Sequence, residues 1–303
     1  MDFEARDVVK SFGEKQVLRG VDLQAERGKA LGLLGRNGAG KTTTIRIIMG
    51  VFPPDAGELL LDGKPLRHEK INFGYLPEEH GLYPKQVISE QLTYLGRLRG
   101  LSPRDARAAA KKWLQRLGME EFLPKKLDTL SKGNQQKIQL AAALLTDPDF
   151  IILDEPFSGL DPVNAAVLKD IIRELISAGK LVLFSSHQMN YVEEFCDDIA
   201  ILNRGKIVLA GRIREIKRSY DRSRIVVDSR QAEQIAAWCP ENLQGIVSGA
   251  EAEGARARIT MRSADCKNRL LAALAGQGFD MDSVHVFEPS LNDIFVEYTE
   301  DAI

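Results

Sequence analysis

The chain has 303 residues, of which 44% are hydrophobic and 28% are charged, so it has the material for a sizeable core and the length of two domains. Its formal net charge of -2 at pH 7 argues against a dedicated nucleic-acid binder, which would carry a basic face, and we expect no nucleic-acid partner. The chain begins without a signal-peptide pattern, and no apolar run approaches the roughly 20 residues that span a bilayer. We therefore expect any membrane crossing to come from another chain.

Buried strands and helices alternate through the first two-thirds of the chain. We expect strands at 30–34, 150–153 and 181–184, and helices at 43–49, 135–145 and 163–177. Strands that are buried on both faces appear as continuous apolar runs, and their alternation with helices predicts a mostly parallel sheet. Residues 1–28 and 58–63 are typical of antiparallel strands, and residues 88–145 are typical of a helical subdomain inserted into this α/β core.

The pattern changes after about residue 220. A strand, a helix, two strands, a helix and a strand follow one another, and a short helix over 292–298 closes the chain. This βαββαβ order predicts a small α+β domain with a ferredoxin-like fold. We therefore expect an α/β unit over residues 1–220 and an accessory domain over residues 221–303.

A glycine-rich loop follows the first buried strand and precedes the first helix. It matches the phosphate-binding pattern G-x-x-x-x-G-K-[ST], in which glycines let the backbone wrap around phosphate and the N–H groups at the helix start face the anion. The lysine adds a full positive charge, and the threonine hydroxyl can ligate Mg²⁺. The alternative is a tight turn that binds nothing, but the lysine and threonine favour a nucleotide and Mg²⁺ as ligands. The predicted nucleotide-binding residues here are Gly35, Arg36, Asn37, Gly38, Ala39, Gly40, Lys41, Thr42 and Thr43.

Two carboxylates, Asp154 and Glu155, end the second buried strand. Ligands gather at the carboxyl ends of parallel strands, so we expect Asp154 to help hold Mg²⁺ and Glu155 to polarise the attacking water as a general base. A solvated loop is an equally good interpretation of these two residues alone. The phosphate loop upstream makes a metal and water site the better one.

Three further motifs make the pattern specific. Residues 130–136, LSKGNQQ, resemble the signature of the ATP-binding cassette (ABC) family, which is usually written LSGGQ. Residues 158–161, SGLD, resemble the D-loop of that family, and His187 resembles its switch histidine. With the phosphate loop and the acidic strand end, five motifs follow the family's order, so the chain resembles an ABC transporter ATP-binding subunit with a P-loop ABC ATPase core.

The resemblance implies a mechanism in which two cassettes pair head to tail and sandwich ATP between them. Ser131 and Gly133 of one cassette would bind the γ-phosphate that the phosphate loop of the other cassette holds, and Asp161 of the D-loop would join the nucleotide site. His187 would contact the γ-phosphate and keep the attacking water in place. Phe12 occupies the place of the family's adenine-stacking aromatic, with ordinary packing in the N-terminal sheet as the alternative.

The chain departs from the family pattern within the signature and at one further position. The family has a glutamine after the strand near residues 74–77, and here that position is Glu78. A carboxylate can still ligate magnesium, so Glu78 is a predicted metal ligand together with Thr42 and Asp154. The stretch around this position and the ending of the chain resemble one bacterial branch, the sodium-efflux-like (NatA-type) ATPases, which carry an extra C-terminal domain.

The resemblance implies an ATPase that pairs with a second copy and drives a separate multi-span membrane permease, with export as the direction. It also implies a place on the inner face of the cell membrane, and three widely spaced cysteines fit a reducing cytoplasm. The alternatives are a soluble ABC ATPase in translation or repair and a regulatory ATP-binding module. The single cassette and the lack of sustained heptads disfavour the former, and Glu155 and His187 disfavour the latter. For the C-terminal domain we expect a dimerising or regulatory role.

Overall fold

The computed structural model describes residues 2–79 and 81–300. Its contacts divide the chain into two compact units, Met1–Ile213 with Phe295–Ile303 and Arg214–Ile294. This division differs from the expected boundary after residue 220. The helix α7 (Ile213–Ser219) already leads into the second unit, and the end of the chain is counted with the first.

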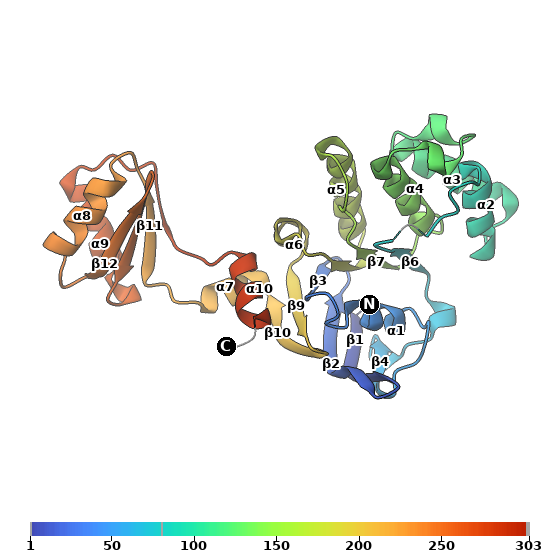
Figure 1. Cartoon of the computed structure of the whole chain (residues 1–303), viewed down its shortest axis with the longest axis horizontal. Coiled ribbons are helices and arrows are strands. Elements are labelled where there is room, and N and C mark those ends of the chain that lie inside the picture. Colours follow the sequence, from blue (N-terminus) through green and yellow to red (C-terminus); the bar gives the residue numbers. More distant parts are fainter. Residues whose placement is uncertain (1, 80, 301–303) are drawn as a thin grey trace. The chain divides into compact units, whose positions relative to one another are not determined.

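A six-stranded sheet forms the centre of the first unit, with the order β10-β9-β3-β8-β7-β6 (Figure 1). The strands are β3 (Ala30–Leu34), β6 (Phe73–Leu76), β7 (Phe150–Asp154), β8 (Leu181–Ser185), β9 (Asp198–Asn203) and β10 (Lys206–Arg212). All neighbours pair in parallel except β9 and β10, which form a hairpin. Strands β3, β7 and β8 are buried at every residue, which explains their continuous apolar sequences and confirms the predicted parallel sheet.

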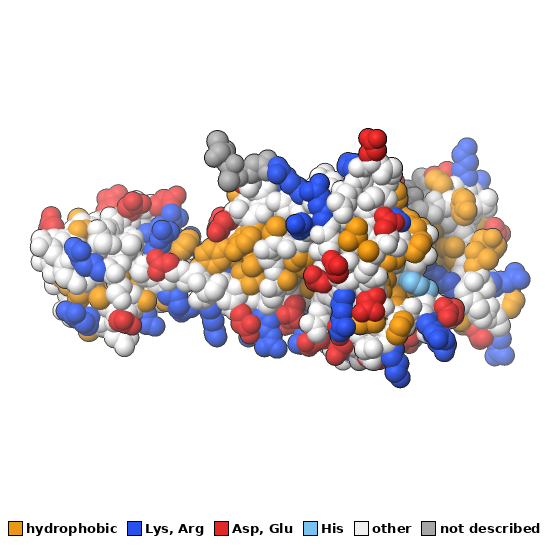
Figure 2. All heavy atoms as spheres, turned by 90° about the horizontal axis from the view of Figure 1, so that it is seen from below, with side chains coloured by type: hydrophobic (Ala, Val, Ile, Leu, Met, Phe, Trp, Pro, Cys, Tyr) orange, Lys and Arg blue, Asp and Glu red, His pale blue; other side chains and the backbone are white. Residues whose placement is uncertain are grey.

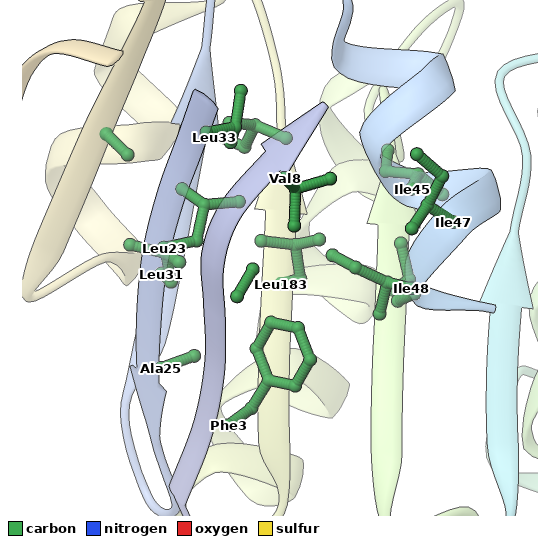
Figure 3. Packing of buried hydrophobic residues seen from close by; sticks show 14 of the residues in the cluster. Phe3, Val8, Leu23, Ala25, Leu31, Leu33, Ile45, Ile47, Ile48 and Leu183 are labelled. Atoms are coloured by element: carbon green, nitrogen blue, oxygen red, sulfur yellow. The ribbon is translucent and has the colours of Figure 1, made fainter. Parts of the chain in front are cut away.

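An antiparallel sheet with the order β2-β1-β4-β5 packs on the same core. Its strands are β1 (Asp2–Phe12), β2 (Lys15–Glu26), β4 (Ala56–Leu61) and β5 (Lys64–Pro65). Phe3 and Val8 of β1 point toward Leu183 of β8 and toward Ile48 of the helix α1 (Lys41–Ile48), as Figure 3 shows. Each side chain of this size contributes about 1.5–3 kcal/mol to stability when it is fully buried. The core therefore holds α1 against both sheets.

Three helices form the helical subdomain, α2 (Ile88–Leu98), α3 (Pro103–Arg116) and α4 (Lys132–Leu144). Ser102 caps α3 by accepting from the backbone N–H of Asp105, and a proline follows it at the first helical position. The guanidinium of Arg99 donates to the carbonyls of Ala142 and Ala143, each at 3.2 Å, and so satisfies the end of α4. Burial lowers the pKa of Arg99.

The remaining elements of the first unit complete its faces and turns. They are α5 (Pro162–Ser177), α6 (Met189–Phe195) and the short 3₁₀ helices His68–Lys70, Glu120–Phe122 and Leu127–Thr129. Arg204 and Gly205, both with positive φ, make the two-residue turn between β9 and β10.

The second unit is a four-stranded antiparallel sheet with the order β12-β13-β11-β14. Its elements are β11 (Arg224–Asp228), α8 (Ala232–Asn242), β12 (Val247–Glu253), β13 (Arg256–Met261), the 3₁₀ helix Ala264–Cys266, α9 (Lys267–Gln277) and β14 (Ser283–Val286). The chain order βαββαβ and the position of the first strand between the third and the fourth confirm the predicted ferredoxin-like fold. The last helix, α10 (Leu291–Thr299), follows.

Basic and acidic side chains are intermingled on the face shown in Figure 2. Within the part of the chain that the structure describes, no helix is both long enough and apolar enough to cross a membrane. Cys196 and Cys239 are buried and their surroundings raise the pKa of each thiol, that of Cys239 to about 11.

Candidate functional site

A cavity of about 1010 Å³ lies at the carboxyl ends of the parallel strands. It brings together the phosphate loop after β3, Glu78 after β6, Asp154 and Glu155 at the end of β7, and His187 after β8. The predicted site residues that line it are Gly35, Arg36, Asn37, Gly38, Gly40, Lys41, Thr42, Thr43, Glu78, Asp154, Glu155 and His187. Ala39 lies buried within the loop, and Phe12, Ser131, Gly133 and Asp161 lie elsewhere.

The backbone of the phosphate loop requires glycine at two positions. A Cβ at Gly35 would lie 2.5 Å from the carbonyl oxygen of Leu202, and one at Gly40 would lie 2.7 Å from Leu18. Gly40 also has a φ of 117° as the residue before α1, a conformation that side chains disfavour. The glycines therefore let the loop pass close to β9 while α1 begins directly at Lys41.

Lys41 places its charge against the loop. Its ammonium donates to the carbonyl of Gly35 at 2.6 Å. Thr42 and Thr43 line the cavity in the first turn of α1, where the backbone N–H groups have no partner within the helix. The helix start and the lysine together present positive charge to the cavity, which suits a bound phosphate group.

Asp154 is a buried carboxylate at the base of the cavity, only 5% exposed. Burial raises its pKa, and the nearby charges of Glu78 and Glu155 act in the same direction, while the Ser185 hydroxyl and the charge of Lys41 partly oppose the shift. A divalent cation would remove this electrostatic cost, so the site fits Mg²⁺. The described residues contain no cluster of three or more His, Cys, Asp or Glu side chains around a metal position. In nucleotide sites, Mg²⁺ is held by one or two carboxylates and by substrate phosphates.

Glu155 is held in a defined orientation by the loop after β8. It is 4% exposed and has a φ of 48°, which is uncommon for a non-glycine residue. One carboxylate oxygen accepts from the Ser186 hydroxyl at 3.0 Å, and the other accepts from the His187 backbone N–H at 2.8 Å. The His187 Nδ1 lies 2.7 Å from this second oxygen, so it carries the proton, because a carboxylate only accepts.

Two glutamines of α4 connect the signature helix with the cavity. Gln139 donates to the carbonyls of Pro77 and Glu79, at 2.9 and 3.1 Å, and so holds the loop that carries Glu78. Gln136 donates at 3.4 Å to the carbonyl of Pro156, next to Glu155. Both glutamines are buried, so these bonds fix the loops against the helix.

The predicted signature and D-loop residues form a second group that does not line this cavity. Ser131 caps α4 by accepting from the backbone N–H of Asn134 at 3.4 Å. Gly133 faces Asn164, because a Cβ there would lie 3.2 Å from the Asn164 Nδ2. Asp161 caps α5 by accepting from the backbone N–H of Asn164 at 2.9 Å. The two helix starts are therefore neighbours.

Phe12 is 50% exposed at the end of β1 and makes an edge contact with Phe52. It pairs across the hairpin with Lys15, which does line the cavity. Sequence reasoning missed several lining residues, because the segments that carry them contain no motif. These are Lys15, Gln16, Val17 and Arg19 of β2, Arg204 of the β9–β10 turn, and Phe295 of α10.

Comparisons with known proteins agree with this geometry. A model of the ABC transporter family matches residues 18–158, and one of the ATP-binding protein DrrA1-3-like C-terminal domain matches residues 211–299. An uncharacterised ABC transporter ATP-binding protein of Bacillus subtilis, YhaQ, is 42% identical over 96% of each chain. The chain belongs to the ABC transporter ATP-binding proteins. This membership confirms the family that the five motifs predict.

Two further relatives refine the comparison. The daunorubicin resistance ATP-binding protein DrrA3 of Streptomyces coeruleorubidus is 31% identical, with 96% of this chain and 94% of that protein covered. NatA of Bacillus subtilis is 35% identical, but the match covers only 70% of this chain and 90% of NatA. The C-terminal domain is therefore better described as DrrA-like than as NatA-type.

Solved structures share the cassette fold. The dimeric ABC transporter cassette MJ0796 has a TM-score of 0.63 and 25% identity, and the match covers 70% of this chain and 99% of that one. A second dimeric structure of MJ0796, in a post-hydrolysis state, is bound to ADP and Pi. The first unit of this chain thus has the fold of a cassette that is known as a dimer and with hydrolysis products.

Proposed function

We propose that this protein binds and hydrolyses ATP in the cavity at the carboxyl end of its parallel sheet, and that it does so as one of two paired copies that drive a separate membrane permease. The observation that carries the proposal is the convergence on one cavity of the phosphate loop, Asp154, Glu155 and His187. Phosphoryl transfer needs positioned positive charge, a carboxylate that can bind a metal ion and a group that orients water, and this cavity supplies all three.

The phosphate loop would hold the triphosphate. Its backbone N–H groups and the start of α1 would face the β-phosphate, and Lys41 would exchange its bond to the Gly35 carbonyl for one to phosphate. Asp154, the Thr42 hydroxyl and Glu78 would hold Mg²⁺, which neutralises charge on the phosphate oxygens when bound. The buried position of Asp154 favours this role.

Glu155 would orient the attacking water and accept its proton. Its orientation is fixed by the Ser186 hydroxyl and by the His187 backbone N–H, so little reorganisation is needed at the moment of reaction. Because Nδ1 of His187 carries its proton toward Glu155, the 69% exposed ring can present Nε2 to the γ-phosphate or to the partner cassette.

A second copy would complete the site. Ser131, Gly133 and Asp161 lie outside the cavity that holds the phosphate loop, so one chain cannot bring them to its own triphosphate. The start of α4 presents backbone N–H groups and a serine hydroxyl, which suit a γ-phosphate held by another chain. The dimeric structures of MJ0796 support this arrangement.

The permease would bind beside the loop that carries Glu78. Tyr83, Tyr94 and Leu98 are large apolar residues on or near α2, and each is more than half exposed. Gln139 ties the same loop to α4, whose first residues carry the signature, so movement of the loop would reach the partner's nucleotide. Export as the direction is supported by the DrrA-like C-terminal domain and by the relative named for daunorubicin resistance.

Affinity purification from detergent-solubilised membranes tests the assignment to transport. We expect a multi-span membrane protein to co-purify and to raise the rate of ATP hydrolysis. A matched variant, Tyr94→Asp with Leu98→Asp, should lose the partner while it keeps basal hydrolysis. Purified protein that neither binds nor cleaves ATP in the presence of Mg²⁺ would contradict the proposal.

A further inference from the structure

A phenylalanine from the far end of the chain lines the nucleotide cavity. Phe295 lies in α10, is half-buried, and borders the cavity together with residues of β2 and of the β9–β10 turn. The side-chain amide of Asn203, at the end of β9, donates to the carbonyl of Tyr298 at 3.1 Å. The last turn of α10 is thereby tied to the strand that leads into Arg204, another lining residue (Figure 1).

Phe295 is the one phenylalanine, tyrosine or tryptophan among the described residues that line the cavity. Phe12, at the position where the family has its base-stacking aromatic, is 50% exposed and does not line the cavity. Its ring contacts Phe52 edge-on with 5.4 Å between the centroids, and the ammonium of Lys10 lies within 5.8 Å of both rings. Among the lining residues, the aromatic surface that a base could contact therefore comes from α10.

The lining of the cavity has two chemically different parts. The loop residues, the carboxylates and His187 suit a triphosphate and its metal. The remaining part consists of Lys15, Gln16, Val17, Arg19, Arg204 and Phe295. A nucleobase is flat and apolar on its faces and polar at its edges, so Val17 and Phe295 suit a face while Gln16 suits an edge.

We propose that Phe295 is a further nucleotide-contacting residue, which packs against the base of ATP and makes nucleotide affinity depend on the last helix of the chain. This inference rests on the proposed ATP site. It also gives α10 a defined role at the nucleotide cavity. Because coupling free energies are reciprocal, ATP binding should in turn stabilise the position of α10 at the cavity.

Titration calorimetry on the full-length protein tests the contact with two ligands, ATP and inorganic tripolyphosphate. Removing an aromatic ring that stacks on a base lowers affinity by about tenfold. Phe295→Ala should therefore weaken ATP binding by about that factor. Tripolyphosphate has no base, so its affinity should not change. Val296→Ala, on the same helix but outside the lining, is the matched control and should leave both affinities unchanged.

Two more variants keep the test decisive if Phe295→Ala fails to fold. Phe295→Leu keeps the volume without the aromatic face and should weaken ATP binding, whereas Phe295→Trp should retain it and gain a fluorescence change with ATP but not with tripolyphosphate. Unchanged ATP affinity in Phe295→Leu, or an equal loss for both ligands, would overturn the inference. If the unmodified protein binds no ATP, the proposed function fails instead.

Discussion

The two units differ in what they bury. The first unit buries polar groups next to its cavity, including the carboxylates of Asp154 and Glu155 and the hydroxyl of Ser186. In the described part of the second unit, the buried cluster is apolar and Ser229 is the one buried polar residue. Burying carboxylates costs stability unless they are paired or bind a cation, so the first unit carries the features of a reaction site and the second those of a packed accessory domain.

The largest effect that this comparison predicts concerns Glu155. Replacing it by Gln keeps the shape but removes the proton acceptor, so the rate of ATP hydrolysis should fall by about 10²–10⁴ while ATP still binds. Steady-state phosphate release and nucleotide titration measure the two quantities. Glu174→Gln, at an exposed glutamate paired with Arg116, is the control and should keep its rate. A rate near that of the unmodified protein would mean that Glu155 is not the base.

The next effect separates the cavity from the signature helix. Ser131→Arg should reduce hydrolysis by about 10²-fold or more, comparable to the loss of a stabilising donor at a reaction centre. ATP affinity of the single chain should stay the same, because Ser131 does not line its own cavity. Ser102→Arg removes the equivalent cap of α3 and is the matched control. Equal losses in both variants would indicate helix destabilisation rather than a role at a partner's site.

The strand order explains how much of this site the sequence could predict. The continuous apolar runs of β3, β7 and β8 predict a parallel sheet, and its carboxyl edge then gathers the motifs. The hydrogen bond between Glu155 and Ser186 could not be predicted in this way. It depends on β7 and β8 being neighbours, with Asp154 opposite Ser185. No local pattern contains that information.

Other features lay outside what a local pattern can predict. The helix α4 begins at Lys132 rather than at the predicted 135, because its start is set by the Ser131 cap and the first residues lack apolar periodicity. The return of α10 to the nucleotide cavity joins residues at opposite ends of the chain. Only the folded structure reveals the contribution of Phe295.

A third prediction concerns the cost of burying Asp154 without a cation. Its pKa is raised in the folded state, so folding binds a proton in the window above the ordinary carboxyl value of 3.8. The stability that this proton contributes is fully present below this window and is lost as pH rises through the folded pKa. In the absence of Mg²⁺ and nucleotide, the Asp154→Asn variant avoids the free-energy cost of burying a charged carboxylate. Its melting temperature at pH 7 should rise by about 2–4 °C for each ~1 kcal/mol of that cost.

Thermal melts at several pH values check this prediction. The advantage of Asp154→Asn should shrink as the pH falls through the raised pKa of Asp154, because the aspartate itself then becomes neutral. The same variant should bind ATP less tightly in the presence of Mg²⁺. A variant that is less stable than the unmodified protein at pH 7 would show that Asp154 has stabilising partners of its own and would weaken the case for a metal site.

The smallest expected effect on the nucleotide site comes from the core of the second unit. Leu270 is fully buried there, and Leu270→Ala should destabilise that unit by about 2–5 kcal/mol. ATP affinity should change by less than about twofold, a difference well below 1.4 kcal/mol. Leu33→Ala in the core of the first unit should instead lower both stability and ATP affinity. Hydrogen exchange and nucleotide titration distinguish the two outcomes.

The central claim is that a second copy of the chain completes the ATP site of the first. Light scattering on Glu155→Gln, with and without ATP and Mg²⁺, tests it most directly. We expect the mass of two chains with ATP. Adding Ser131→Arg should abolish this dimer, and adding Ser102→Arg should preserve it. A single-chain mass at full ATP occupancy, or a dimer that Ser131→Arg leaves intact, would contradict it.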